Sequence, residues 1–438
     1  MYRSLLSSLD LWTKNPQRKP LLLYGARQVG KTWLLKELGR TRFESFVHVD
    51  FLKEAGLRSL FLEDLDPKRI ISELELRRGT RINPEATLLI LDEIQEAPRA
   101  LTSLKYFCEE AREYHVAAAG SYLGIELHEG ETFPVGKVDS YTLRPLSFTE
   151  FLMAMGEEML ADAICRGGLG LVSRSAKERV ERMLREYLVV GGMPEVVSAF
   201  AESTDFLGAR DIQLQILADF EGDFGKHAPA RLVERMRMVW RSVPSQLARE
   251  NRRFVYGAVR KGARAKDLEE AIQWLRDYGV VTKVPRVKAL RCPLSGYEDL
   301  AAFKLYALDV GLLGALSELP PAIVLDESRL FTEFKGALTE QYVLQELLAQ
   351  GRRPFYWSAE RATAEVDFAI DEGSGVIPLE VKASENLKAK SLRVAHETFD
   401  LQRCVRTSLS AYRDEGWIAN VPLWGLSQLS CAYAGACR

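Results

Sequence analysis

The sequence predicts an α/β fold built on a parallel sheet, and three observations lead to that prediction. A glycine-rich loop at residues 25–32 stands between an apolar run at 21–24 and a helix-like segment. A second apolar run, 88–91, ends in two acidic residues. Apolar runs then alternate with helix-like segments through the first part of the chain, which is the order of strands and covering helices in a mostly parallel sheet.

The loop has the residue types and spacing of a phosphate-binding loop. Its members are Gly25, Ala26, Arg27, Gln28, Val29, Gly30, Lys31 and Thr32. Glycines at both ends let the backbone N–H groups surround a phosphate, and the positive end of the next helix adds to the field. Lys31 is expected to reach the β- and γ-phosphates, and Thr32 to bind Mg²⁺ through its hydroxyl. The sequence therefore predicts a site for ATP with Mg²⁺.

Asp92 and Glu93 follow an apolar run that is typical of a strand buried on both faces of a parallel sheet. Ligands bind at the carboxyl ends of such strands. Asp92 is expected to hold Mg²⁺, directly or through water, and Glu93 to polarise the water that attacks the γ-phosphate. Taken alone, the pair would be read as a solvated acidic turn. The phosphate-binding loop upstream favours the catalytic interpretation.

Three further segments complete the expected N-terminal domain. An apolar run at 116–119 leads to Ser121, whose hydroxyl could sense the γ-phosphate or orient water, or could cap the next helix. The sequence favours neither role. Residues 46–50 are expected to form another strand. The segment 143–152 reads as a final strand that enters a helix, with a capping box that begins at Ser147.

The middle of the chain is predicted to be helical at 151–225, with a sharp turn at 191–194. Residues 226–325 form the next expected domain, and their first part, 226–266, holds twelve basic residues and only two acidic ones. A helix, a turn, a second helix and an extended segment follow one another there. This is the order of a winged-helix module, which places a helix in a DNA groove and arginines on phosphates.

We interpret the basic stretch as a candidate DNA-binding segment. Its candidate contact residues are Arg249, Arg252, Arg253, Arg260 and Lys261. The alternative is that these side chains form a solvated face that pairs with an acidic neighbouring domain. The size of the charge excess favours DNA.

Residues 326–438 are predicted to form a small α/β domain with a second candidate site. Glu340 falls on a helix, Asp367 on the first strand of a hairpin, and Glu380 and Lys382 on the second strand. Because side chains alternate along a strand, the last two face the same way. Carboxylates that hold Mg²⁺ beside a lysine are what metal-dependent phosphodiester cleavage needs. The alternative is a salt-bridged Glu–Lys pair on a solvated face.

Composition excludes several other classes of protein. Of the 438 residues, 47% are hydrophobic and 27% charged, as in soluble globular proteins. The apolar runs are shorter than the roughly 18 to 20 residues of a membrane span, and the N-terminus lacks an apolar signal core. We therefore expect a cytoplasmic protein without a membrane partner. The cysteines and histidines are scattered without metal-ligand spacing.

At these motifs the chain resembles bacterial and archaeal ATP-binding proteins in which an AAA-type ATPase domain precedes a domain of unknown function, DUF4143. The matching motifs include Leu91-Asp92-Glu93-Ile94-Gln95, Pro145-Leu146-Ser147-Phe148, Gly191-Gly192-Met193-Pro194, Leu308-Asp309-Val310-Gly311 and Leu379-Glu380-Val381-Lys382. The resemblance implies an AAA+ ATPase domain at 1–150, a winged-helix segment and a C-terminal domain similar to the restriction-endonuclease-like superfamily. It also implies homo-oligomers in which neighbours complete each other's sites.

One departure from the family pattern concerns the arginine that such a neighbour would supply. This chain has Lys137 after Gly136, where relatives carry arginine. A lysine offers a point charge without the planar fork of a guanidinium. Arg144 lies nearby in the sequence, and the finger is left unassigned.

Two functions fit these observations. The leading hypothesis is an ATPase that couples turnover to DNA binding or processing through the C-terminal domain. The alternative is a nucleotide-dependent switch that binds a protein partner, with the C-terminal domain as a non-catalytic scaffold.

Overall fold

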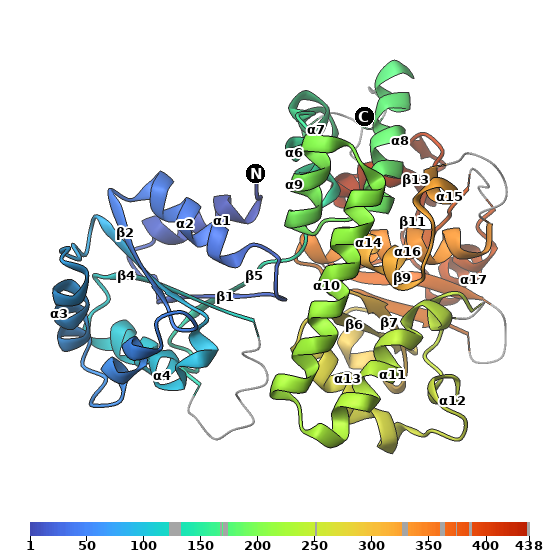
Figure 1. The fold of residues 1–438 in the computed structure, drawn as a ribbon. Helices are drawn as coiled ribbons and strands as arrows, with labels where there is room; N and C mark the ends of the chain where they lie inside the picture. Colours follow the sequence, from blue (N-terminus) through green and yellow to red (C-terminus); the bar gives the residue numbers. More distant parts are fainter. Residues whose placement is uncertain are drawn as a thin grey trace. The chain divides into compact units, whose positions relative to one another are not determined.

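The structure, a computed structural model, describes residues 1–121, 133–166, 169, 174–249, 252–325, 332–359, 364–373, 375–384 and 388–435. These residues form two compact units (Figure 1). The N-terminal unit comprises residues 3–144 with 277–279, and the C-terminal unit comprises 1–2, 145–276 and 280–438. Within the described ranges, every helix is too short or too polar to cross a lipid bilayer.

A five-stranded parallel sheet forms the centre of the N-terminal unit, in the order β2-β3-β4-β1-β5. The strands are β1 (Leu21–Tyr24), β2 (Ser45–Asp50), β3 (Thr87–Asp92), β4 (His115–Gly120) and β5 (Asp139–Thr142). The first four confirm the predicted strands and the predicted fold class. Because β4 lies between β1 and β3, the carboxyl ends of these three strands are neighbours.

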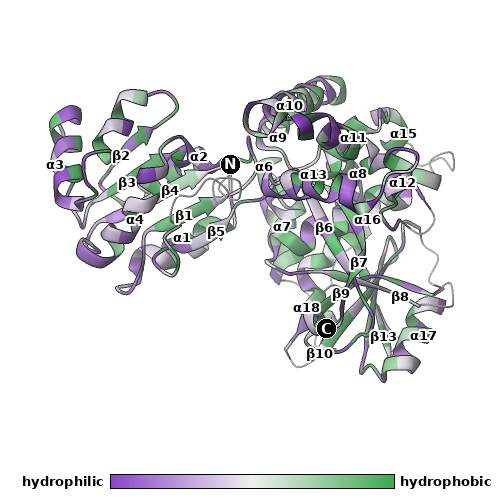
Figure 2. Cartoon of the chain, turned by 90° about the horizontal axis from the view of Figure 1, so that it is seen from below, coloured by the Kyte–Doolittle hydropathy of each residue, from purple (hydrophilic) through white to green (hydrophobic). Residues whose placement is uncertain are grey.

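Helices and short 3₁₀ turns connect the strands of this unit. They are α1 (Leu5–Lys14), α2 (Lys31–Arg42), η1 (Ala55–Phe61), α3 (Pro67–Arg78), η2 (Ile94–Glu96) and α4 (Pro98–Glu110). The side chains of β3 are buried along its whole length, as expected of a strand covered on both faces. Figure 2 accordingly colours β3 and β4 largely green, the colour of hydrophobic residues.

The last strand of the sheet differs from the prediction. It spans Asp139–Thr142, so the segment 143–146 that was expected to be extended follows the strand instead. Half-buried and exposed residues alternate along β5, which pairs with β1 at the edge of the sheet. Polar edge strands lack the apolar run by which buried strands are recognised. The capping box of Ser147 and Glu150 is confirmed at the start of the next helix.

The helical middle of the chain belongs to the C-terminal unit and confirms the prediction. Its helices are α6 (Phe148–Ala154), α7 (Glu158–Arg166), α8 (Arg174–Val190), α9 (Pro194–Ser203), α10 (Phe206–His227), α11 (Ala230–Leu247), α12 (Tyr256–Val259) and α13 (Ala265–Asp277). The turn between α8 and α9 uses Gly191 at a positive φ of 71°, a conformation that favours glycine.

An eight-stranded sheet, in the order β12-β13-β11-β10-β9-β8-β6-β7, forms the core of the C-terminal unit. Its strands are β6 (Val281–Val287), β7 (Glu298–Ala307), β8 (Phe355–Ser358), β9 (Glu365–Glu372), β10 (Gly375–Val381), β11 (Cys404–Ser408), β12 (Arg413–Asp414) and β13 (Ile418–Pro422). Strand β6 pairs in parallel with β8. The extended segment of the expected winged-helix region is therefore continuous with the sheet of the C-terminal domain.

The remaining helices of this unit lie along the second half of the chain. They are η3 (Leu294–Tyr297), α14 (Val310–Leu316), α15 (Pro321–Leu325), α16 (Thr332–Ala349), α17 (Lys390–Phe399), η5 (Leu423–Gln428) and α18 (Leu429–Tyr433). Helix α16 contacts β10, and α17 contacts β9 and β10. The hairpin of β9 and β10 therefore carries helices in the predicted small α/β region.

A buried polar node joins four distant segments of the C-terminal unit. The N–H of Leu146 donates to the carbonyl of Gly192 at 2.7 Å, and the N–H of Gly192 donates to Asp309 at 2.7 Å. Gln345 on α16 donates to Asp309 at 3.0 Å and to the Leu146 carbonyl at 3.3 Å. A methyl group on Gly192 would lie 2.2 Å from that carbonyl oxygen. Glycine is therefore required for this close approach.

A buried carboxyl group lies beside the node. The N–H of Phe148 donates to Glu346 at 2.7 Å, where the chain enters α6. Burial raises the pKa of Glu346 to about 8; the bond from Phe148 opposes the shift, and the charge of Glu150 adds to it. The start of α6 is thus connected to α16 by a hydrogen bond to the carboxyl group of Glu346, which can titrate.

Candidate functional site

The phosphate-binding loop runs from the end of β1 to the start of α2, as predicted. Gly30 has a φ of 92° and precedes α2 directly, a conformation that favours glycine. A methyl group on Gly25 would lie 2.4 Å from the carbonyl oxygen of Leu143. Both positions therefore favour glycine: Gly30 because of its left-handed backbone conformation, and Gly25 because a side chain there would collide with Leu143.

Lys31 is the buried cation of the loop. Its ammonium donates to the carbonyls of Gly25 at 3.0 Å and Ala26 at 2.8 Å, and to the hydroxyl of Ser121 at 2.8 Å. Burial lowers the pKa of Lys31 to about 8, although the charges of Glu93 and Asp92 oppose the shift. The three donors of the ammonium are thus engaged within the site, and a phosphate oxygen would replace one of these partners.

Asp92, at the end of β3, is connected to two neighbouring elements. Its carboxylate forms a hydrogen bond with His48 of β2 at 3.1 Å, and the Thr32 hydroxyl of α2 lies near enough to lower its pKa. Burial raises the pKa of Asp92, but the interactions with His48 and Thr32 outweigh it, so the pKa is lowered. Asp92 is therefore held as a carboxylate beside the hydroxyl that was expected to bind Mg²⁺.

His48 is a member of the site that the sequence did not reveal. It lies on β2 between valines, and only the order of the strands places β2 next to β3. A lone histidine in an apolar strand is otherwise an ordinary core residue. The sequence shows only that a polar residue alternates with apolar ones along this strand. This pattern does not indicate that His48 contacts Asp92.

Glu93 follows Asp92 in a left-handed backbone conformation, with a φ of 50°. Such conformations cost energy for residues other than glycine and occur often at functional sites. The Glu93 carboxylate accepts a hydrogen bond from Gln95. Its charge also acts on Lys31, which places Glu93 within electrostatic range of the loop.

Ser121 lies directly after β4, and Tyr24 at the end of β1 pairs with Gly120. The Ser121 hydroxyl accepts the bond from Lys31 and is buried. This contact connects it to the phosphate-binding loop. The helix that it could alternatively cap would fall at residues 122–132, which lie outside the described residues.

The residues of the N-terminal site fit a Mg²⁺–nucleotide ligand. The Thr32 hydroxyl lies near enough to the Asp92 carboxylate to lower its pKa, so both could contact one ion or its water shell. The loop from Gly25 to Lys31 supplies backbone donors and one ammonium. Oxygen ligands with a nearby ammonium match a magnesium-bound triphosphate.

The two candidates for an arginine finger lie within the N-terminal unit. Lys137 forms an ion pair with Glu109 at 2.7 Å, and this contact raises the pKa of Lys137. Burial lowers the pKa of Arg144. Lys137 is thus engaged within its own chain, and the finger stays unassigned.

The C-terminal hairpin brings three of the four predicted residues together. Leu379 pairs with Phe368, so Glu380 and Asp367 are neighbours across the hairpin. Asp367 accepts the N–H of Val381 at 2.7 Å, and Lys382 pairs with Glu380 at 2.6 Å. Burial and the charge of Asp367 raise the pKa of Glu380, and Lys382 opposes them.

The fourth residue, Glu340, is surrounded by other partners. It accepts a hydrogen bond from Tyr306 at 3.0 Å, lies 3.7 Å from the ammonium of Lys304, and forms an ion pair with Arg252. The same nitrogen of Arg252 lies 3.9 Å from Asp367. Among the described residues, histidine, cysteine and acidic side chains form no group of three arranged to hold a metal ion. The carboxylates of this region are paired with protein cations instead.

The basic stretch divides into paired and unpaired side chains. Four of its basic side chains form ion pairs: Lys226 with Asp223 of the same helix, Arg231 with Glu270, Arg241 with Glu221, and Arg252 with Glu340. Arg253 is exposed and donates to the carbonyl of Ala301. Five other bases are exposed and make no ion pair with any described residue: Arg249, Arg260, Lys261, Arg264 and Lys266. Part of the stretch thus pairs within the unit, and part faces solvent.

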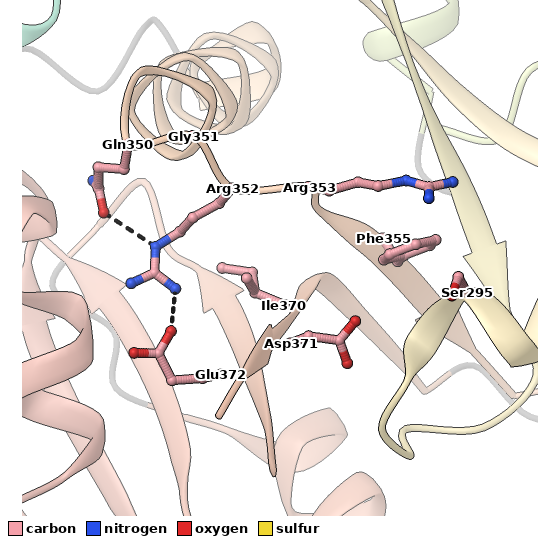
Figure 3. A pocket seen from close by; sticks show the side chains of 9 residues that line it. All are labelled: Ser295, Gln350, Gly351, Arg352, Arg353, Phe355, Ile370, Asp371 and Glu372. Atoms are coloured by element: carbon pink, nitrogen blue, oxygen red, sulfur yellow. Dashed lines mark hydrogen bonds and ion pairs between the residues drawn. The ribbon is translucent and has the colours of Figure 1, made fainter. Parts of the chain in front are cut away.

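A cavity of about 430 Å³ lies near the end of α16, and Figure 3 shows the side chains that line it. Arg352 donates there to Glu372 at 2.6 Å and to Gln350 at 3.2 Å, and Arg353 lies over the ring of Phe355. The charges that line this cavity are therefore engaged in holding the fold.

Comparisons with known families cover most of the chain. Residues 17–152 match the family model of an AAA domain, and residues 335–425 match the domain of unknown function DUF4143. Residues 181–322 match another domain of unknown function, DUF8612. The first two matches confirm the resemblance inferred from the motifs. No curated protein matches the sequence.

Solved structures give more distant likenesses. A Walker-type ATPase of Pyrococcus abyssi is 14% identical, with a TM-score of 0.43, over 71% of this chain and 94% of the other. Cdc6p from Pyrobaculum aerophilum is 13% identical, with a TM-score of 0.24, over 73% of this chain and 92% of the other.

Proposed function

We propose that this chain, in which an AAA domain is joined to a C-terminal DUF4143 domain, is a cytoplasmic ATPase that couples ATP hydrolysis to DNA binding. One observation carries the ATPase part of the proposal. Lys31 donates a hydrogen bond to Ser121, and Thr32 lies near enough to Asp92 to lower its pKa, so the phosphate-binding loop lies beside the ends of both β4 and β3. A triphosphate in the loop would contact all three elements at once.

Each residue of this arrangement has a role in phosphoryl transfer. The backbone of the loop and Lys31 would hold the β- and γ-phosphates, and Thr32 with Asp92 would hold Mg²⁺, which when bound neutralises phosphate charge. Glu93 would accept the proton of the attacking water. When a nucleotide binds, the Ser121 hydroxyl would exchange its hydrogen bond with Lys31 for one with the γ-phosphate or the attacking water. The protein thus supplies positioning and electrostatic stabilisation rather than a covalent intermediate.

The DNA part of the proposal rests on the exposed bases of the basic stretch. They lie around α12 and at the start of α13, whereas α13 itself carries Asp267, Glu269 and Glu270. A helix with acidic side chains is poorly suited to contact the edges of nucleobases in a DNA groove, because phosphates line both sides of the groove. We therefore propose that this winged-helix-like region binds the phosphate backbone without strong sequence preference.

We propose that the chain is divided into functional domains at residues 150, 225 and 325. We also propose that the last domain is similar to restriction endonucleases. The order α11, α12, α13, β6, β7 supports a winged-helix region. The hairpin of β9 and β10 with helix α16 supports a nuclease-like region. Assembly into homo-oligomers would allow a neighbour to supply the missing finger.

The proposal is tested by measuring ATP turnover with Mg²⁺ in the presence and absence of single-stranded, duplex and branched DNA. Turnover that rises with DNA supports coupling, and analysis of the same DNA for nicks reports on cleavage. Turnover that DNA leaves unchanged would favour the protein-partner switch instead. That alternative gains from the pairing of Glu340 with Arg252, which suits a scaffold domain.

DNA contact is tested by a charge-matched pair of double variants. Arg260→Ala with Lys261→Ala removes two exposed bases, and should reduce the slope of log affinity against log salt by about two. Arg231→Ala with Arg241→Ala removes two ion-paired bases and changes the net charge equally. Equal losses in both variants would show that only the overall charge matters and would reject the proposed contact surface.

A further inference from the structure

We infer, on the premise that the chain binds ATP as proposed, that Arg3 is a positioning residue of the phosphate-binding loop. Its guanidinium holds the peptide group between Val29 and Gly30 in the orientation that a bound phosphate requires. Arg3 lies ahead of α1, far from the loop in the sequence, and belongs to none of the motifs described above.

The contacts of Arg3 join the phosphate-binding loop to the segment that follows β5. Its Nη1 donates to the carbonyl of Val29 at 3.0 Å, and its Nη2 donates to the carbonyl of Arg144. The residue is 4% exposed. Burying a charged side chain costs free energy unless its donors find partners, whereas an apolar side chain could fill the same space without that cost. The carbonyls that the guanidinium binds therefore explain its place better than core filling does.

Arg3 reaches the loop from a fixed position at the start of α1. The N–H of Leu6 donates to the carbonyl of Arg3 at 3.1 Å, in the first turn of the helix. The helix contacts α2 (Figure 1) and buries Leu9 and Trp12. The indole N–H of Trp12 donates to the carbonyl of Lys19 at 2.8 Å. The guanidinium is therefore held by a packed element, which is what a positioning residue needs.

The bond from Arg3 to Val29 determines the direction of the next N–H group. The peptide between Val29 and Gly30 is trans. In a planar trans peptide the C=O and the N–H point in opposite directions, so the N–H of Gly30 points away from Arg3. Gly30 directly precedes α2, and a phosphate-binding loop holds its ligand through N–H groups at this place. Arg3 thus fixes one donor for the phosphate before the nucleotide arrives.

The second carbonyl that Arg3 binds belongs to a segment that lies against the start of the loop. The N–H of Leu143 donates to the carbonyl of Tyr24 at 2.7 Å, and a methyl group on Gly25 would lie 2.4 Å from the Leu143 carbonyl oxygen. By bonding to Arg144, the next residue, Arg3 connects this segment to the far end of the loop. A guanidinium stays protonated in proteins, so it also adds a positive charge behind the loop.

The test uses the full chain and measures nucleotide affinity separately from turnover. Arg3→Met keeps the apolar stem and removes both donors. A phosphate contact of the loop is made in the ground state and in the transition state alike, so its loss raises Kd and KM more than it lowers kcat. We expect Arg3→Met to bind ATP and ADP about tenfold more weakly than the wild type. Its kcat at saturating ATP should stay within about threefold of the wild-type value.

Arg210→Met is the matched control. Arg210 also bridges two backbone carbonyls, those of Gly311 and Leu319, but it lies in the C-terminal unit. Both variants should lower thermal stability, and only Arg3→Met should lose nucleotide affinity. Arg3→Lys keeps the charge but lacks the planar fork that reaches both carbonyls, so its affinity should fall between those of the wild type and Arg3→Met.

The role of Arg3 is overturned if folded Arg3→Met binds ATP and ADP as tightly as the wild type, or if Arg210→Met loses as much affinity. A fall in kcat with unchanged affinity would also overturn it. If Arg3→Met does not fold, Arg3→Lys gives the answer, and wild-type affinity in that variant contradicts the role. Failure of the proposed function looks different, because the wild type itself would then bind no nucleotide, and the role of Arg3 would fall with it.

Discussion

The ammonium of Lys31 lies 2.8 Å from the hydroxyl of Ser121, although the phosphate-binding loop and β4 are far apart in the sequence. The contact exists because β4 is inserted between β1 and β3. Strand β4, which follows β3 in the chain, therefore ends beside the phosphate-binding loop. A residue after β4 can respond to whatever Lys31 binds.

The Lys31–Ser121 contact predicts a selective loss of turnover in Ser121→Ala. A hydrogen bond to a charged group contributes about 1.5–3 kcal/mol, so kcat for ATP should fall about tenfold or more. The affinity for ATP should change less, because Lys31 retains its other contacts. Ser121→Thr, which keeps the hydroxyl, is the control. A Ser121→Ala protein with lower thermal stability but normal kcat would show that Ser121 only caps a helix.

The buried ammonium of Lys31 predicts that ATP binding takes up a proton in mildly alkaline solution. With a pKa of about 8, Lys31 is largely neutral at pH 8.5 and largely charged at pH 6.5. A triphosphate favours the charged form. Proton uptake on binding should therefore appear at pH 8.5 and vanish at pH 6.5, and affinity should fall as the pH rises through 8.

Calorimetry in two buffers with different ionisation enthalpies measures this proton uptake. Lys31→Arg is the control, since a guanidinium stays charged at both pH values and should take up no proton. Lys31→Ala should lose ATP binding altogether. Wild-type affinity in Lys31→Ala would count against the assigned site.

Glu93→Gln should separate binding from hydrolysis. The amide keeps the size of the side chain but cannot accept the proton of water, and a general base contributes on the order of 100-fold or more to the rate. We expect ATP to remain bound while turnover falls by about that factor. Filter binding and single-turnover assays distinguish the two steps. Normal turnover in this variant would remove Glu93 from the proposed role.

The buried carboxyl of Glu346 predicts how stability changes with pH. Its pKa in the folded chain is about 8, above its ordinary value, so the folded state binds more protons than the unfolded state between those values. Stability is then fully present below the ordinary pKa and is lost as the pH rises through 8, by at most roughly 1.4 kcal/mol per pH unit. Glu346→Gln should flatten this loss.

Denaturant unfolding of the wild type and Glu346→Gln at pH 5.5, 7 and 8.5 tests the prediction. The glutamine carbonyl can still accept the N–H of Phe148, so the variant isolates the charge from the hydrogen bond. Asp219→Asn on α10 provides an acidic-residue control from outside the node. Parallel stability profiles for wild type and Glu346→Gln would show that Glu346 does not titrate in this range.

Local sequence was enough to predict the elements that carry the candidate N-terminal site. The loop ends at Lys31 because a helix begins there, and Asp92 follows a run whose burial was predictable from its residues. The partner His48 was not predictable, because it reaches Asp92 through the order of the strands, and the same order creates the contact of the predicted Ser121 with Lys31. Strand order depends on long-range packing, which one sequence read locally does not encode.

The C-terminal region shows the same division. The hairpin and the proximity of Asp367, Glu380 and Lys382 followed from alternation along strands. The pairing of Glu340 with Arg252 did not, because the two residues come from segments that were expected to be separate domains. The excess of basic residues along the chain predicted that Arg252 binds DNA, whereas in the folded structure its guanidinium pairs with the carboxylate of Glu340.

The pairing of β6 with β8 has a practical consequence for work with fragments of the chain. A cut near residue 325 would separate two adjacent strands of one sheet and expose the N–H and C=O groups of both. Open strand edges promote association between molecules. Either half made alone is therefore expected to precipitate or to pair with itself, whereas the two halves produced together should recombine into a soluble complex.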